Sequence, residues 1–409
     1  MTKHPDCNHG LTRRGFVHAG AVAAGGLLAA PVMFTPAALA QTRDGAGGRI
    51  LVVLELSGGN DGLNTVVPYG DDAYYRHRPK IGLRKERLLK LDDHFGLNGG
   101  MVGFERLYKD GKLAIVHGCG YADPSFSHFT SMAYWQTAAP NSGEQYGWVG
   151  RLADAMAPDA PANFLINIGA TQSLAVRAHA HVPVVFNNPD NFTREMFFEE
   201  KEALQAAPPP AKVANASQRY LLDIARSAND ASAAVRKAWA NYRSPVDYGL
   251  VDLGLRRVAA MISADMPARL YYTSYANNAF DTHVVQNDLH SRLLTYTSDA
   301  VAGFMQDMER IGRANDVTVM IFSEFGRRVP ENTSLGTDHG AANTMFVVGK
   351  QVKGGQYGEI PSLTKLDAGD NLVFTTDFRR VYATMAETWL GQKITPALLK
   401  GSFTPFAMI

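Results

Sequence analysis

The chain has 409 residues, of which 46% are hydrophobic and 19% are charged. This composition excludes an intrinsically disordered chain, and the length suffices for one large domain or two ordinary ones. The formal net charge of +1 gives no electrostatic reason to expect nucleic acid or an anionic membrane as a partner.

The N-terminus has the pattern of a targeting segment. Arg13 and Arg14 precede an apolar stretch rich in Ala and Gly, which ends in the A-x-A cleavage signature of residues 38–40. The paired arginines predict export by the twin-arginine (Tat) machinery, with the signal peptide 1–40 cleaved after Ala40. We therefore expect a periplasmic or extracellular protein without a stable membrane anchor, because the apolar run is short for a span.

Cysteine use sets a further limit. Cys7 lies in the signal peptide, so the mature chain keeps only Cys119 and cannot form an intramolecular disulfide. Cys119 is interpreted as a small buried residue after a strand rather than as a catalytic thiol.

Apolar runs alternate with helical patterns along the mature chain, which favours an α/β fold with a mainly parallel sheet. The expected strands are 49–56, 112–120, 162–169, 182–187, 268–275, 317–326 and 343–349. Apolar residues at helical spacing predict helices at 103–112, 132–139, 196–207, 217–244 and 293–314. The Pro-rich segment 207–217 is interpreted as a linker. We expect a single domain, 41–409, with a helical or cap insertion around 185–250.

Metal-capable side chains follow three of the expected strands. Asp61 follows the first strand after a Gly-rich turn, Asp281 and His283 follow the strand 268–275, and Glu324 follows the apolar run 317–322 that begins the strand expected at 317–326. Asp338 and His339 come soon after Glu324, and His290 is a weaker candidate on the following helix. Ligands of open α/β sheets bind outside the carboxyl ends of the strands, which is where these residues fall. Each carboxylate could instead serve a turn or a helix cap.

A hydroxyl-rich segment precedes the helix expected at 132–139. Ser125, Ser127, His128 and Thr130 lie there. A hydroxyl at a helix start is commonly a cap, but the same position can hold a nucleophile, because the helix N-terminus stabilises an anion.

The chain resembles a large group of Tat-exported bacterial proteins, the domain of unknown function 1501 family. The resemblance rests on "LELSGGNDGLNTVVPY", "SFSHFTSMAYW", "FDTH", "FSEFGRR", "GTDHG" and "DFRRVYATMAETWLG", and it covers roughly residues 49–395. That family in turn resembles the alkaline phosphatase and sulfatase superfamily. The resemblance implies a three-layer α/β/α sandwich, alkaline-phosphatase-like, with one or two divalent metal ions (Zn, Mn, Ca or Mg) at the carboxyl end of the sheet.

The resemblance also implies roles for particular residues. Ser127 matches the nucleophile, with Ser125 as the alternative. The implied metal ligands are Asp61, Asp281, His283, Glu324, Asp338 and His339. Arg327, Asn60 and His128 are expected to bind substrate. The chain departs from the superfamily pattern where Glu324 is followed by Phe325, where one residue separates Asp281 from His283, and in lacking the Cys-x-Pro-x-Arg motif, which argues against a classical sulfatase.

Together these features favour a hydrolase that acts on a phosphate or sulfate ester, either a small molecule or a polymer-borne anion. The alternative is an exported binding or assembly protein on the same fold, without catalysis, which the departures from the ligand pattern favour.

Overall fold

The computed structural model describes residues 48–159, 162–192, 215 and 230–409. The chain divides into two compact units, one made of Met1–Thr35 with Thr193–Ala234 and one of Pro36–Phe192 with Val235–Ile409. The second unit contains the sheet and the candidate site. The signal peptide expected at 1–40 and the helix expected at 196–207 lie outside the described residues, as does nearly all of the expected linker.

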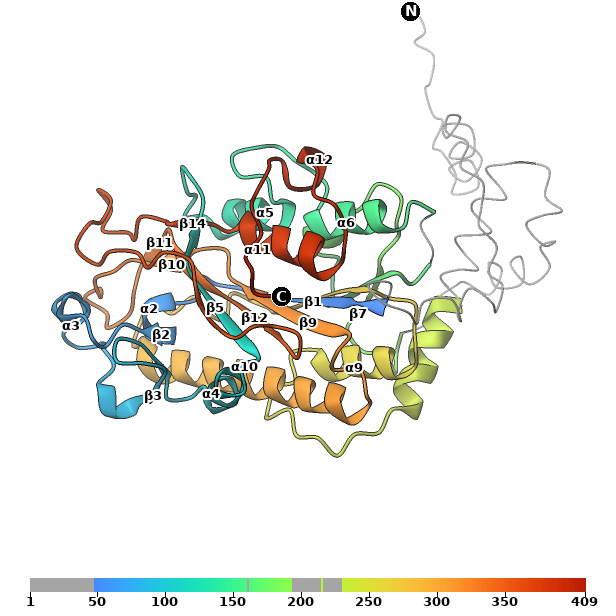
Figure 1. The fold of residues 1–409 in the computed structure, drawn as a ribbon, viewed down its shortest axis with the longest axis horizontal. Coiled ribbons are helices and arrows are strands. Elements are labelled where there is room, and N and C mark those ends of the chain that lie inside the picture. The colour runs from blue at the N-terminus through green and yellow to red at the C-terminus, as the bar shows by residue number, and fades with distance from the viewer. Residues whose placement is uncertain (1–47, 160–161, 193–214, 216–229) are drawn as a thin grey trace, which may run out of the picture. The chain divides into compact units, whose positions relative to one another are not determined.

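A nine-stranded sheet runs through the middle of the second unit (Figure 1). The strands follow one another in the order β13-β5-β12-β9-β1-β8-β6-β7, and β14 also pairs with β5. Their bounds are β1 Ile50–Leu56, β5 Leu113–Gly120, β6 Leu165–Ile168, β7 Val184–Phe186, β8 Leu270–Tyr275, β9 Val317–Phe322, β12 Asn343–Gly349, β13 Gly355–Tyr357 and β14 Thr376–Asp377. The pairings are parallel, except that β12 runs antiparallel to both β5 and β9.

The central strands form where the sequence has continuous apolar runs. All seven residues of β1 are buried, as are all six of β9 and all seven of β12. Such runs suit strands that are covered on both faces, because side chains alternate between the two faces and both must be apolar. Each of the seven strands expected from the sequence is present in this sheet.

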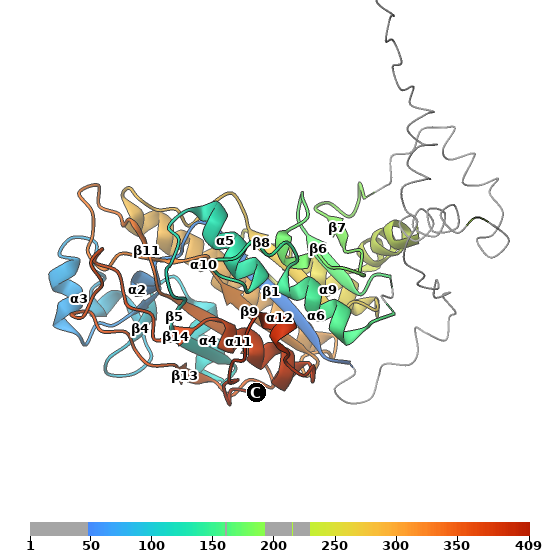
Figure 2. The ribbon, with the colours of Figure 1, turned by 90° about the horizontal axis from the view of Figure 1, so that it is seen from above.

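Helices cover both faces of the sheet (Figure 1). One layer holds α4 Val102–Lys109, α9 Leu255–Ser263 and α10 Gln286–Arg310. The other holds α5 His128–Thr137, α6 Trp148–Met156, α11 Arg379–Ala383 with its π-helical continuation Thr384–Trp389, and α12 Pro396–Leu399. Figure 2 shows the second layer from above, lying across the strands. The expected three-layer α/β/α sandwich with a mainly parallel sheet is therefore confirmed.

Aromatic side chains fill the space between the sheet and the second helical layer. Trp135 of α5 stacks on Phe378 at a ring-centroid distance of 4.1 Å, and Trp148 of α6 stacks on Tyr382 at 4.2 Å. Trp389 is fully buried in the same core. Trp135 also stacks on Phe322 of β9 at a ring-centroid distance of 5.6 Å, which fixes α5 on the sheet, and α5 begins at the candidate site.

Short elements complete the described fold. Helices α2 Gly62–Thr65 and α3 Asp72–His77 follow β1, and a small sheet pairs β2 Val66–Val67 and β3 Leu88–Lys90 with β4 Gly96–Asn98. A separate ribbon pairs β10 Gly326–Arg327 with β11 His339–Gly340. Single-turn 3-10 helices occur at Lys85–Arg87 and Leu174–Val176.

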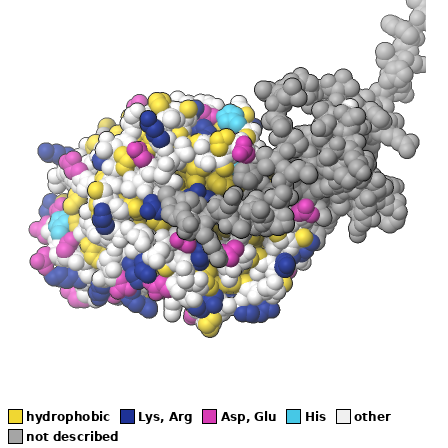
Figure 3. Space-filling view, turned by 45° about the vertical axis from the view of Figure 1, so that its right-hand side comes forward, with side chains coloured by type: hydrophobic (Ala, Val, Ile, Leu, Met, Phe, Trp, Pro, Cys, Tyr) yellow, Lys and Arg dark blue, Asp and Glu magenta, His cyan; other side chains and the backbone are white. Residues whose placement is uncertain are grey.

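The surface carries charges of both signs. In Figure 3, Lys and Arg side chains are interspersed with Asp and Glu over the coloured part of the face shown. No helix among the described residues is both long enough and apolar enough to span a membrane.

Candidate metal centre

Three neighbouring strands end beside the start of α5, and the candidate site lies at this edge. The strands β9, β1 and β8 are adjacent and parallel, so the loops after them meet at one edge of the sheet. His339 arrives on β11, which is held in register by the pairing of His339 with Arg327. His128 is the first residue of α5.

Two glycines bring the loop after β1 into close contact with its neighbours. Gly58 has a φ of +117°, and a Cβ there would lie 2.5 Å from the backbone nitrogen of Asp281. Gly59 has a φ of +75°, and a Cβ would lie 2.2 Å from the ring of Phe325. Only glycine allows both the backbone conformation and the approach. The Gly-rich turn therefore sets the distance between the loops after β1, β8 and β9.

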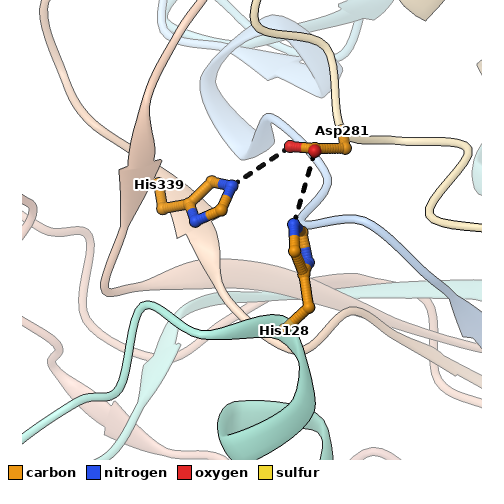
Figure 4. A group of neighbouring side chains, drawn as sticks. All are labelled: His128, Asp281 and His339. Atoms are coloured by element: carbon orange, nitrogen blue, oxygen red, sulfur yellow. Dashed lines mark hydrogen bonds and ion pairs between the residues drawn. The ribbon is translucent and has the colours of Figure 1, made fainter.

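The carboxylate of Asp281 lies at the centre of a group of imidazoles (Figure 4). Its Oδ1 is 2.9 Å from His283 Nε2 and 3.1 Å from His339 Nε2, and its Oδ2 is 3.4 Å from His128 Nε2. The Nε2 atoms of His283 and His339 are themselves 2.9 Å apart. Ligand atoms of His128, Asp281 and His339 all lie within 4.8 Å of one another. Side chains from the loop after β8, from β11 and from the start of α5 thus bring donor atoms close together.

Each of the three imidazoles has its other nitrogen next to an acceptor. His128 Nδ1 is 2.8 Å from Glu324 Oε1, His339 Nδ1 is 2.7 Å from the carbonyl oxygen of Phe126, and His283 Nδ1 is 3.3 Å from Asp338 Oδ1. We assign the proton of each ring to Nδ1, where it can be donated to these acceptors. The lone pair of each ring then lies on Nε2, which is the arrangement that metal-binding histidines adopt.

His128 supplies the test of whether these residues fit a metal ion. Its Nε2 atom is buried and makes no hydrogen bond to any described residue, and Asp281 Oδ2 lies 3.4 Å from it. A buried acceptor without a hydrogen bond costs free energy, which a bound cation would recover. Three imidazole nitrogens and a carboxylate oxygen form a donor set typical of zinc and other transition metals, whereas calcium and magnesium prefer oxygen.

The pKa values of these groups favour the protonation states that metal binding requires. Burial would raise the pKa of Asp281, but the hydrogen bond from Arg327, the contact with the His339 ring and the charge of Arg327 outweigh burial and hold the pKa at about 2. Burial lowers the pKa of His339, so its neutral form is favoured. The hydrogen bond to Glu324 raises the pKa of His128. Metal ligands must be deprotonated, so binding at this site would compete with protons at His128 first.

Glu324 and Asp338 hold imidazoles rather than facing the central point directly. Glu324 is fully buried, and its Oε1 also accepts a hydrogen bond of 2.8 Å from the backbone nitrogen of Gly58. Asp338 is half-exposed and accepts a hydrogen bond of 3.1 Å from Asn332 Nδ2, which lowers its pKa. Both were expected as metal ligands. In the structure each contacts the Nδ1 atom of an imidazole, so the imidazole ring lies between the carboxylate and Asp281.

Arg327 is buried and its donors are occupied. Nε donates to the carbonyl of Gly59 at 2.6 Å, Nη1 to that of Thr337 at 3.0 Å, and Nη2 to that of Phe280 at 3.0 Å and to Asp281 Oδ1 at 2.8 Å. The guanidinium therefore ties together the loops after β1 and β8 and the segment before β11. In this position it orients Asp281 rather than reaching outward to an ester.

Asp61 and Asn60 are bound by other groups. Asp61 caps α2 and forms a fully buried ion pair with Arg78 at 2.6 Å, with Gln286 as a further hydrogen-bond donor. Asn60 Oδ1 lies 2.9 Å from Nε2 of His290, which is also buried. These side chains belong to a separate polar network. They lie next to the imidazole group but do not contact its donor atoms in the way expected of metal ligands.

Ser127 occupies the N-cap position of α5 with an exposed side chain. Among the described residues it makes no side-chain capping bond, so its hydroxyl is not used to cap the helix. Ser125 instead accepts a hydrogen bond of 3.3 Å from the backbone nitrogen of Ser127.

A cleft of about 270 Å³ opens beside His128 and Glu324. Its polar lining comes from Ser57, Gln136 and Asn278 at the carboxyl end of the sheet. Its apolar lining is Phe129, Met132, Ala133 and Leu174. The cleft gives the imidazole group access to a ligand of moderate size.

Some of these partners have no signal in the sequence. Asn332 lies in a loop between Glu324 and Asp338, and the carbonyl of Phe126 is a backbone group, so neither is marked by residue type or spacing. Arg78 follows Asp61 by 17 residues and meets it only because α3 folds back onto the loop after β1. His128 could be found, because it follows Ser127 in a motif already singled out, although it was expected to bind substrate.

The fold and this site define an α/β/α sandwich protein with a His/Asp group that could hold a metal ion. The chain belongs to the family described as protein of unknown function DUF1501, whose model matches residues 49–387, and the family membership expected from the motifs is confirmed.

No curated protein matches the chain. Three solved structures with similar folds are Ps i-CgsB in complex with k-i-k-neocarrahexaose, the lipoteichoic acid synthase LtaP from Listeria monocytogenes, and a protein in the alkaline phosphatase superfamily from Vibrio parahaemolyticus. Each is 10% identical to this chain, with TM-scores of 0.39, 0.39 and 0.36. The matches cover 87%, 81% and 78% of this chain and 75%, 75% and 64% of the others.

Proposed function

We propose that the chain is an exported, metal-dependent hydrolase of phosphate or sulfate esters. The observation that carries the proposal is the convergence of three imidazole Nε2 atoms on the carboxylate of Asp281, with each Nδ1 held by an acceptor and His128 Nε2 buried without a hydrogen bond.

His128, Asp281, His283 and His339 would hold the metal ion, and Glu324, Asp338 and the Phe126 carbonyl would orient the imidazoles. Zinc suits this donor set best. The bound ion would supply Lewis-acid polarisation of an ester oxygen and stabilise negative charge on it.

Charge at the site explains why a cation is needed before an anionic ester can bind. The carboxyl groups of Asp281, Glu324 and Asp338 all contact imidazoles of this group, and Arg327, which pairs with Asp281, has its donors occupied by protein groups. An anion approaching these groups alone would meet net negative charge. A divalent ion next to Asp281 reverses the sign of the local field.

Ser127 is the proposed nucleophile, with Ser125 as the alternative. Its hydroxyl is exposed at the N-terminus of α5, where unpaired backbone N–H groups favour negative charge. The Ser127 oxygen would form a bond to phosphorus or sulfur as the bond to the ester oxygen breaks; the hydroxyl would lose its proton to solvent, and the departing ester oxygen would take up a proton from solvent and leave as an alcohol. A water molecule would then displace the serine, which regenerates the hydroxyl and releases phosphate or sulfate.

The expected site of action is the periplasm or the exterior of the cell. The proposal rests on the Tat pattern of residues 1–40 in the sequence. The partners would be the Tat machinery during export and then an anionic ester, either small or borne on a polymer.

A specific observation favours the alternative, a binding or assembly protein without catalysis. Asp61 forms an ion pair with Arg78, and Arg327 donates its hydrogen bonds to backbone carbonyls. Two groups that were expected to bind a metal ion or substrate are therefore bound to other protein groups.

Metal analysis of the purified mature protein, combined with an ester screen, tests the proposal. The wild type should carry a stoichiometric divalent metal ion, Asp281→Ala should lose it, and Ser127→Ala should keep it while losing turnover. A folded wild type that takes up no added metal would overturn the hydrolase. If the wild type retains the metal but turns over no phosphate or sulfate ester, the alternative of a binding or assembly protein would be favoured.

A further inference from the structure

Exposed apolar side chains gather on the segments that carry the imidazoles. Phe126 and Phe129 flank His128, and Phe129 is 91% exposed. Val284 and Val285 directly follow His283 and are 62% and 61% exposed. We call the group on these segments the apolar rim; it consists of Phe126, Phe129, Val284, Val285, Leu289 and Leu335.

Hydrogen bonds hold these segments next to one another. The backbone nitrogen of Val285 donates to the carbonyl of Ser334 at 2.9 Å, and that of Gln286 donates to the carbonyl of Leu335 at 2.9 Å. Asn332 Nδ2 donates to the carbonyl of His283 at 3.0 Å. The carbonyl of Phe126 is the acceptor that holds His339. The apolar rim therefore stands on the same backbone that positions the candidate metal ligands.

The backbone of two rim residues is unusual. Val285 has a φ of 43° and Leu335 a φ of 59°, both in the left-handed region. A β-branched residue rarely adopts this conformation, and such conformations collect at functional sites. Neither side chain is buried, so core packing does not account for the choice of a bulky apolar residue at these positions.

The cleft beside His128 continues the apolar surface. Phe129 belongs to both the rim and the cleft lining, where Met132, Ala133 and Leu174 extend it inward. By contrast, Val182 lies just before β7, at the amino end of this parallel strand and away from the carboxyl edge, although it is 68% exposed. Single exposed apolar residues are ordinary, but a group around one polar centre is not.

We infer that the ester taken by this site is amphiphilic: its anionic head lies at the imidazole group and an alkyl or acyl chain contacts the apolar rim. The inference rests on the proposed function. A chain laid along the rim removes apolar surface from water on both partners, whereas a small polar ester would leave the rim exposed. The gain is about two- to fourfold in affinity per methylene that is buried.

A series of non-hydrolysable alkylphosphonates tests the inference without depending on turnover. Methyl-, butyl- and octylphosphonate are titrated into the mature, zinc-loaded protein, and binding is followed by phosphorus NMR and calorimetry. Affinity should rise at least tenfold from methyl- to octylphosphonate. Phe129→Ser and Val284→Ser should each reduce octylphosphonate affinity about three- to tenfold, while Val182→Ser, a matched exposed valine, should leave it unchanged.

The outcomes separate the two proposals. Equal affinity for methyl- and octylphosphonate would overturn the amphiphilic substrate and leave the hydrolase standing. Octyl glucoside binding at the rim as tightly as octylphosphonate would also overturn it, because the rim would then serve a partner independent of the anionic head. Failure of all phosphonates and of inorganic phosphate to bind the zinc-loaded protein would overturn the proposed function itself.

Discussion

His128 Nδ1 lies 2.8 Å from Glu324 Oε1, and this contact points the opposite nitrogen of the ring toward Asp281. Glu324 follows the end of β9 by two residues, is fully buried and also accepts a hydrogen bond from the backbone nitrogen of Gly58. It therefore joins the loop after β1, the end of β9 and the start of α5. A carboxylate in this position sets both the tautomer and the direction of the imidazole, although it does not itself reach the central point.

Glu324→Gln should weaken zinc binding about 10- to 100-fold, because an amide is a poorer acceptor for the imidazole and can present the wrong group to it. The measurement is a competition titration of zinc against a chelator. Glu105→Gln, on the outer surface of α4, is the control and should bind zinc as the wild type does. Unchanged affinity in Glu324→Gln would show that His128 is not a ligand.

Asp61→Asn should retain the metal but lose stability. Asp61 pairs with Arg78 while both side chains are buried, and removing its charge leaves the guanidinium uncompensated, which costs about 3–5 kcal/mol. The free energy of unfolding is measured by denaturant titration, and metal content by elemental analysis of the folded variant. Loss of metal in Asp61→Asn at full stability would place Asp61 among the ligands instead.

Arg327→Lys should also destabilise the protein, by about 2–4 kcal/mol, because an ammonium group cannot replace the several donors that Arg327 directs to different carbonyls. The neighbouring Arg328 is exposed, and Arg328→Lys should change stability by less than about 0.5 kcal/mol. A stable Arg327→Lys variant with impaired ester binding alone would restore the substrate-clamping role expected from the sequence.

The sequence predicted the sheet well because its central strands are buried on both faces and are therefore written as continuous apolar runs. It also predicted that Asp281, His283 and His339 lie at one edge, since parallel strands place their carboxyl ends together. The sequence could not show which carboxylates face the candidate metal centre and which accept a hydrogen bond from an imidazole. Glu324 and Asp281 both follow strands, and only the three-dimensional path of α5 decides that His128 lies between them.

The antiparallel direction of β12 could not be predicted from the sequence for a similar reason. Residues 343–349 are as apolar as the parallel strands, and burial on both faces leaves the same pattern whichever way a strand runs. The direction is set by the connection from β9 to β12, residues 323–342, which contains the ribbon of β10 and β11 and no crossover helix.

The last prediction concerns Glu55, a carboxyl group inside β1 that the sequence did not single out. It is buried beneath α5, where it accepts hydrogen bonds from Tyr272 and, at 2.7 Å, from Gln136. Burial raises its pKa from 4.5 to about 7, although these hydrogen bonds oppose the shift. The folded protein thus holds a proton that the unfolded chain releases between about pH 4.5 and 7, so this group lowers stability as pH rises through that window.

Glu55→Gln keeps an acceptor for Tyr272 and Gln136 but removes the charge. The variant should match the wild type in stability near pH 4.5 and exceed it by up to about 3 kcal/mol at pH 8, the free-energy equivalent of the pKa shift. Denaturant titrations at both pH values, with chelator present so that no cation contributes, measure the difference. Tyr272→Phe is the control for a lost hydrogen bond. Unlike Glu55→Gln, it should not become more stable relative to the wild type when the pH is raised to 8. A constant difference between wild type and Glu55→Gln across this range would mean that Glu55 is ionised in the folded protein throughout, and that α5 rests over a negative charge instead of a neutral carboxyl group.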